Sequence, residues 1–195
     1  MGMGTVWRHL PNLVSVLRIV LVVPIGWMML ERRYDTALWL VLAAGLSDAF
    51  DGWLARRFGW RSRLGAFLDP AADKVLLLTG FVVLALMDRL PWWLALIVVG
   101  RDAVIVGGAL AYRLLIGPFL AQPRRLAKYC TLVQILCILL VLLQSSGFAN
   151  IHVQAAQWLT AVLTVASGVD YVLHWAARAR HTGRSAATPD KERMA

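Results

Sequence analysis

Six apolar stretches separated by short polar connectors constrain the fold of this 195-residue chain more than any other feature. Each stretch is close to the roughly 20 residues that a helix needs to cross a bilayer. Apolar residues make up 59% of the chain and charged residues only 16%, so a soluble fold of this length would leave much apolar surface in water. The stretches are residues 12–30, 36–56, 64–87, 91–115, 126–146 and 153–177. The sequence therefore predicts an all-α integral membrane protein with six transmembrane helices.

The distribution of basic residues predicts how this membrane domain, residues 1–177, is oriented. With the N-terminus inside, fourteen Lys and Arg residues fall in inside segments, and three, Arg32, Arg33 and Arg89, fall in outside loops. The positive-inside rule then places both termini in the cytoplasm. Residues 178–195 are polar and basic, and we expect them to form a disordered tail.

The net charge of +9 is interpreted as contact with anionic lipid head groups, and no nucleic-acid partner is expected. The abundance of Arg, Ala, Leu and Trp suits a GC-rich bacterium. We therefore expect the protein to reside in a bacterial cytoplasmic membrane.

Four aspartates fall within 26 residues of the second and third apolar stretches, where a carboxylate costs about 3 kcal/mol or more. Asp48 and Asp51 are three residues apart in the second stretch, and Asp69 and Asp73 are four residues apart in the third. Each pair therefore shares one helical face. The short connector makes the two helices antiparallel neighbours, with both pairs toward the cytoplasmic side. These aspartates are candidates for a polar active site that is open to the cytoplasm.

Four converging carboxylates would repel one another unless cations neutralise them. A donor set of oxygen atoms without Cys or His selects a hard cation, Mg²⁺ or Mn²⁺, and four carboxylates suit two ions. Two such ions are the usual apparatus for displacement at phosphorus. One alternative is structural ion pairs with Arg56, Arg57 or Lys74. The other is a cation-coupled transporter, although transporters place such carboxylates near the midplane rather than beside arginines at one surface.

The stretch that holds the aspartates reads Asp48-x2-Asp51-Gly52-x2-Ala55-Arg56-x8-Gly65-x3-Asp69-x3-Asp73. This spacing resembles the signature of the CDP-alcohol phosphatidyltransferase family, and the six-span layout is also similar. The small residues of the motif leave room for a bulky group against the backbone or for close helix packing.

The resemblance implies a reaction and a set of roles. CDP-diacylglycerol and a pair of divalent cations would bind, the acceptor hydroxyl would attack the phosphorus that carries diacylglycerol, and CMP would leave. A homodimer is also expected from the family. The implied roles are metal binding by Asp48, Asp51, Asp69 and Asp73, general base catalysis by Asp73, and a CDP site shaped by Gly52, Ala55, Arg56 and Gly65.

The start of the chain adds two candidate ligands. Pro11-Asn12-Leu13 with Arg18 resembles the first span of the glycerophospholipid branch of the family. Asn12 and Arg18 would either bind the nucleotide or its phosphates or serve as interfacial anchors.

Two acceptors remain open, phosphatidylglycerol and glycerol 3-phosphate. Arg101-Asp102, without a second Arg eight residues on, resembles the cardiolipin-forming members, as does Lys128 followed by Thr131 and Gln134. Cys130 stands where those members usually have Asn. Residues 167–171, Ser-Gly-Val-Asp-Tyr, instead resemble the phosphatidylglycerophosphate-forming members. We expect phosphatidylglycerol as the acceptor, with Arg101 and Lys128 in its site, Asp102 as the partner of Arg101, and glycerol 3-phosphate as the alternative.

Overall fold

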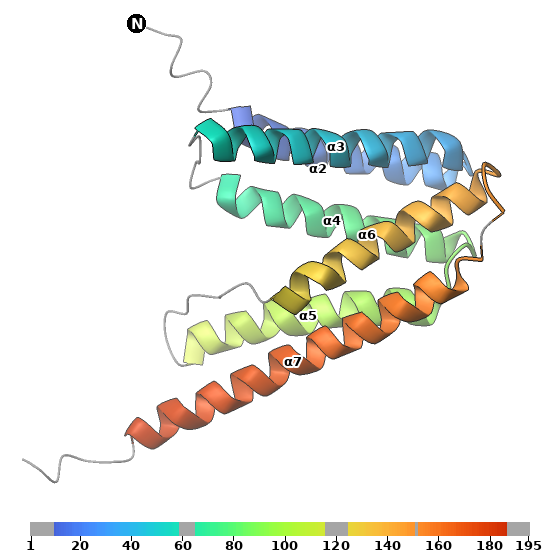
Figure 1. Ribbon diagram of the computed structural model, residues 1–195. Helices are drawn as coiled ribbons and strands as arrows, with labels where there is room; N and C mark the ends of the chain where they lie inside the picture. The colour runs from blue at the N-terminus through green and yellow to red at the C-terminus, as the bar shows by residue number, and fades with distance from the viewer. Residues whose placement is uncertain (1–9, 59–64, 116–124, 151, 187–195) are drawn as a thin grey trace, which may run out of the picture.

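The computed structural model describes residues 10–58, 65–115, 125–150 and 152–186, and within these ranges it contains six helices and no strand (Figure 1). Side chains are described for a smaller set, which leaves out, among others, those of residues 10–15, 51–56, 65–71, 111–115 and 175–186. The helices are α2 (Leu10–Leu30), α3 (Tyr34–Phe58), α4 (Gly65–Leu86), α5 (Trp92–Leu115), α6 (Arg125–Ser145) and α7 (Gln154–Ala186). The predicted all-α class is confirmed, and each of the six apolar stretches coincides with one helix.

The last helix continues further than the sequence analysis expects. Helix α7 runs to Ala186, so residues 178–186 are helical rather than part of a disordered tail. The segment is rich in Ala and Arg, which are among the strongest helix formers, and this propensity extends the helix beyond its apolar stretch.

Two of the helices are long and apolar enough to cross a membrane by themselves, within the part of the chain that the structure describes. They comprise Leu126–Ser145 in α6 and Gln154–His174 in α7, and α2 contributes the shorter apolar segment Val16–Leu30. Helices α3, α4 and α5 carry ionisable residues inside their apolar runs. Ionisable residues lower the mean hydropathy, so the same charges that suggest a site weaken the signal for a membrane span.

Successive helices run in opposite directions, and short turns join them in pairs at one end of the bundle (Figure 1). The turn after α2 places Arg32 at a φ of 60°, and the N–H of Arg33 donates to the carbonyl of Met28 at 2.9 Å. The turns after α4 and α6 likewise contain a left-handed residue, Asp88 and Gly147. We call this the turn end of the bundle, and the opposite end, where α2 begins and α7 ends, the terminal end.

The hydrophobic core lies in the half of the bundle that is nearer the turn end. Its fully buried side chains include Met29 of α2, Phe81 and Leu84 of α4, Leu94 of α5 and Leu142 of α6. The aspartates of the sequence motif lie in the other half, toward the terminal end. The core therefore packs the helices against one another at the turn end.

Helix α4 packs closely against α6 and α2 at two glycine residues, one on α4 and one on α2. A Cβ atom at Gly80 would lie 2.8 Å from Cδ1 of Ile138 on α6, and one at Gly26 of α2 would lie 3.2 Å from Cγ2 of Thr79. Small residues allow helix backbones to approach closely. Helix α4 consequently lies at the centre of the bundle, in contact with α2, α5 and α6.

Candidate active site

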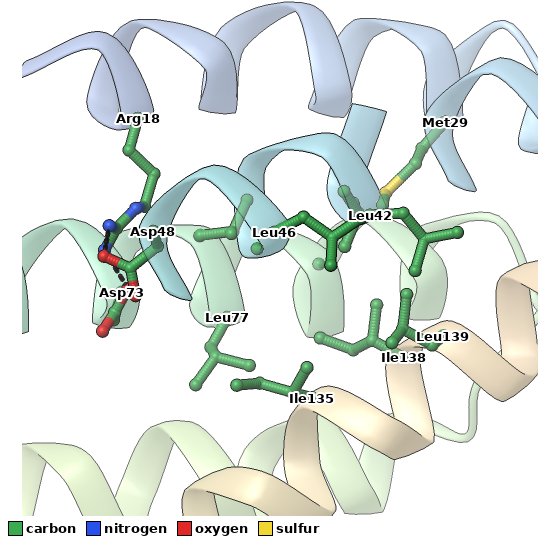
Figure 2. A pocket seen from close by; sticks show the side chains of 14 residues that line it. Arg18, Met29, Leu42, Leu46, Asp48, Asp73, Leu77, Ile135, Ile138 and Leu139 are labelled. Carbon is green, nitrogen blue, oxygen red and sulfur yellow. Dashed lines mark hydrogen bonds and ion pairs between the residues drawn. The ribbon is translucent and has the colours of Figure 1, made fainter. Parts of the chain in front are cut away.

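Three helices bring one arginine and two aspartates of the sequence prediction together. The guanidinium of Arg18 on α2 forms ion pairs with Asp48 of α3 through Nη2 and with Asp73 of α4 through Nη1 (Figure 2). Helix α2 packs against both α3 and α4, which brings three side chains that are far apart in the sequence into one cluster.

Burial differs sharply within this cluster. The side chain of Arg18 is only 4% exposed, whereas those of Asp48 and Asp73 are 42% and 45% exposed. A buried guanidinium requires anionic partners, and the two carboxylates supply them. The two aspartate side chains are partly exposed, so their carboxylates remain able to accept a further ligand.

The donor set of the cluster fits a hard divalent cation. Asp48 and Asp73 offer only oxygen atoms, and they are held on adjacent helices at the same level of the bundle. Arg18 supplies between them the positive charge that an ion would also supply. Among the residues whose side chains are described, no three acidic, His or Cys residues gather. Asp51 and Asp69, one turn away on the same two helices, lie outside that set.

A cavity of about 320 Å³ opens beside this cluster (Figure 2). Arg18, Asp48 and Asp73 line its polar end, and the remaining wall is almost entirely apolar. The apolar lining comes mainly from Val41, Leu42 and Leu46 of α3, Leu76 and Leu77 of α4, and Ile135, Ile138 and Leu139 of α6, with Met29 of α2 toward the turn end. A charged end followed by an apolar corridor suits an amphiphilic ligand, whose head and tail differ in polarity in the same way.

A second polar network joins α4, α5 and α7. Arg101 donates from Nη1 to Oδ1 of Asp102 at 2.6 Å and from Nη2 to Oγ of Ser167 at 2.7 Å. Nζ of Lys74 lies 2.6 Å from the same Oδ1 of Asp102. The expected pair of Arg101 with Asp102 is therefore present, and both residues are buried.

The network borders a second cavity of about 750 Å³, between α4, α5, α6 and α7. Arg101 and Lys128, which the sequence analysis assigns to one site, both line it. Lys74 and Tyr171 line it as well, and the sequence analysis assigned neither to this site. A lysine inside an apolar run, directly after Asp73, is the signal that could have identified Lys74.

The remaining predicted site residues lie in helices, but their side chains are outside the set that the structure describes. These residues are Asn12, Asp51, Gly52, Ala55, Arg56, Gly65 and Asp69.

Fold and site together define an all-helical protein with charged side chains between its helices and an apolar corridor beside them. The sequence profile of the CDP-alcohol phosphatidyltransferase family matches residues 8–169. The chain belongs to this family, which is a membrane-associated family of enzymes.

Three relatives illustrate the range of the family. The chain is 33% identical over 186 residues to the chloroplastic CDP-diacylglycerol–glycerol-3-phosphate 3-phosphatidyltransferase 1 of Oryza sativa subsp. japonica, covering 84% of this chain and 56% of the relative. It is 37% identical over 121 residues to the cardiolipin synthase (CMP-forming) of Rattus norvegicus, covering 62% and 39%. It is 34% identical over 174 residues to a probable phosphatidylglycerophosphate synthase of Mycobacterium tuberculosis, covering 84% and 80%. The chain thus spans about half or less of the first two relatives.

Proposed function

We propose that this protein transfers a phosphatidyl group from CDP-diacylglycerol to a glycerol-type acceptor and releases CMP, as a step of phospholipid synthesis. The observation that carries this proposal is the Arg18–Asp48–Asp73 cluster at the polar end of an apolar corridor. The membership of the family supports the reaction class.

In the proposed reaction, the acceptor hydroxyl oxygen forms a bond to the phosphorus that carries diacylglycerol. The bond from that phosphorus to the bridging oxygen of the diphosphate breaks, and CMP leaves with this oxygen. Asp73 accepts the hydroxyl proton, because its half-exposed carboxylate lies at the open, polar end of the corridor. Arg18, whose guanidinium lies between the two carboxylates, supplies a positive charge that can also meet a phosphate oxygen of the donor.

Mg²⁺ or Mn²⁺, bound as a pair of ions, would neutralise the charge of the diphosphate and of the departing CMP. We propose Asp48, Asp51, Asp69 and Asp73 as the residues that hold these ions. Asn12, Gly52, Ala55, Arg56 and Gly65 complete the proposed site for the CDP-lipid, together with Arg18.

The first cavity offers room for an acyl chain, and this leads to a prediction about Gly45. This glycine of α3 lines the corridor, and a Cβ atom there would have no neighbour within 4 Å. Gly45→Leu is therefore expected to fill the corridor without disturbing the helix, and to raise the KM for CDP-diacylglycerol about 10-fold, because several methylene contacts are lost. Gly100 of α5 also has open space around a Cβ atom but lines neither cavity. The control variant Gly100→Leu should therefore leave the KM for CDP-diacylglycerol unchanged. Equal effects of both variants would contradict a corridor for the lipid.

Phosphatidylglycerol is the acceptor that we favour, which makes the protein a cardiolipin synthase. The second cavity carries cations next to an apolar wall that includes Leu132 and Leu136, both largely exposed on α6. Such a wall suits an acceptor with acyl chains better than a small water-soluble one. Glycerol 3-phosphate remains the alternative, since relatives named as cardiolipin synthase and as probable phosphatidylglycerophosphate synthase both match this chain.

We further propose that all six helices cross the membrane as one domain, residues 1–177, with the remaining residues as a cytoplasmic tail. In this arrangement both termini and the active site face the cytoplasm, and the protein resides in a bacterial inner membrane as a homodimer. The support is that α2 begins and α7 ends at the same end of the bundle, the end at which α3 ends and α4 begins (Figure 1).

The test is CMP release by the purified protein in mixed micelles with CDP-diacylglycerol and Mg²⁺ or Mn²⁺. Phosphatidylglycerol and glycerol 3-phosphate are supplied separately, and the lipid product is identified. We expect product only with an acceptor present, more with phosphatidylglycerol, and none after EDTA. Absence of CMP with both acceptors would refute the enzyme function and favour a cation-coupled transporter, for which cation uptake into proteoliposomes is the matching assay.

A further inference from the structure

One buried carboxylate holds two cations from different helices. Asp102 is 8% exposed by side chain, and its Oδ1 lies 2.6 Å from both Nη1 of Arg101 and Nζ of Lys74. Lys74 belongs to α4 and the other two residues belong to α5. The three ionised groups together carry a net charge of +1, so the carboxylate leaves one positive charge that it does not neutralise.

Lys74 is placed to meet a ligand as well as Asp102. Its side chain is 38% exposed and lines the second cavity together with Arg101 and Lys128. Nη1 and Nη2 of Arg101 are engaged by Asp102 and Ser167, and its Nε is buried without a hydrogen-bond partner. The cavity thus has three cations on its wall, which is the chemistry of an anion site.

We infer that Lys74 binds the phosphate of the acceptor, and that Asp102 is the positioning residue that holds Lys74 and Arg101 side by side at the wall of the second cavity. The inference rests on the proposed function and adds a third cation to the two that the sequence indicates.

A purely structural ion pair is the competing explanation. Joining α4 to α5 does not require charges, because apolar side chains of similar size would do so without the cost of desolvating two ions. The carboxylates of the first cluster do not account for Lys74 either, since Asp48 and Asp73 pair with Arg18 and Lys74 pairs with Asp102. A phosphate anion in the second cavity explains why the surplus charge is there. Both candidate acceptors contain such a phosphate, as a monoester or as a diester.

The test compares Lys74→Gln with the unaltered protein, using glycerol 3-phosphate and phosphatidylglycerol in separate assays. We expect the KM for whichever acceptor is used to rise about 10-fold or more, as for loss of a charge-assisted hydrogen bond, with the KM for CDP-diacylglycerol unchanged. Lys74→Arg should recover most of the loss. Arg33→Gln, in the exposed turn after α2, is the control for removing a positive charge and should change neither KM.

The double variant Lys74→Gln/Asp102→Asn separates binding from structure, because it replaces the Lys74–Asp102 ion pair with a neutral pair of similar shape, while Arg101 keeps its hydrogen bond to Ser167. If Lys74 only holds the helices together, the double variant recovers the wild-type KM and thermal midpoint, and the inference is overturned. If Lys74 binds the phosphate, the acceptor KM stays high in both variants. An unchanged acceptor KM in Lys74→Gln would also overturn it, while CMP release by the wild type would leave the proposed function intact. Should Lys74→Gln fold poorly, the double variant provides the same measurement.

Discussion

Asp73→Asn is expected to lower the rate of CMP release at least 100-fold while binding of CDP-diacylglycerol in the presence of Mg²⁺ or Mn²⁺ largely survives. The amide of the Asn side chain cannot take up the proton of the acceptor hydroxyl, and a positioned general base contributes a factor of about 10²–10⁴ to a rate. Arg18 still has Asp48 as a partner in this variant, so the cluster should remain folded. Turnover is measured as CMP formed, and donor binding is measured separately in the absence of acceptor.

Asp88→Asn is the matched control for this substitution. Asp88 is exposed in the turn after α4 at a φ of 55°, a conformation that Asn adopts readily. The same chemical change should therefore leave turnover as it is. Full activity of Asp73→Asn would show that Asp73 is not the base, and equal losses in both variants would point to a general effect on folding.

Arg18→Met is expected to make the stability of the protein depend on divalent cations. The variant removes the buried charge between Asp48 and Asp73, so the two carboxylates repel each other. We expect the thermal midpoint to fall by several degrees without metal, and to recover in part with Mg²⁺ or Mn²⁺ because a bound ion stabilises the folded state. Donor affinity should fall about 10-fold or more, because a charge-assisted contact to phosphate is lost.

Arg18→Lys and Arg33→Met complete this experiment. A lysine can approach one carboxylate but lacks the planar fork with which Arg18 reaches two, so Arg18→Lys should recover only part of the donor affinity. Arg33→Met, at the turn end, should change neither stability nor its response to metal. The idea that Arg18 and an ion serve the same two carboxylates would be contradicted if the thermal midpoint of Arg18→Met were the same with and without Mg²⁺ or Mn²⁺.

Local features of the sequence were sufficient to predict the helices. Apolar runs and their polar breaks are read directly along the chain, and the six predicted stretches agree with the six helices. The pairing of Arg101 with Asp102 was equally accessible, since the two residues are adjacent and share a buried environment. The end of α7 was missed because Ala and Arg favour a helix in a segment whose polarity suggested disorder.

Contacts between helices were harder to predict. The motif predicts that Asp48 and Asp73 lie on neighbouring helices, but the rotation of α2 decides that Arg18 lies between them. Similarly, Lys74 follows Asp73 in the chain, and the sequence analysis considered it as a partner for the motif aspartates. The structure pairs it with Asp102 instead, because consecutive residues of a helix point about 100° apart.

Asp73 and Lys74 have a geometric consequence for bringing two reactants together. One residue borders the corridor proposed for the donor and the next borders the cavity proposed for the acceptor. Their α-carbons are joined by a single peptide unit and are therefore about 3.8 Å apart. A slide of α4 along its axis therefore moves both residues together. The spacing of the two residues along this helix is thus set by covalent bond lengths.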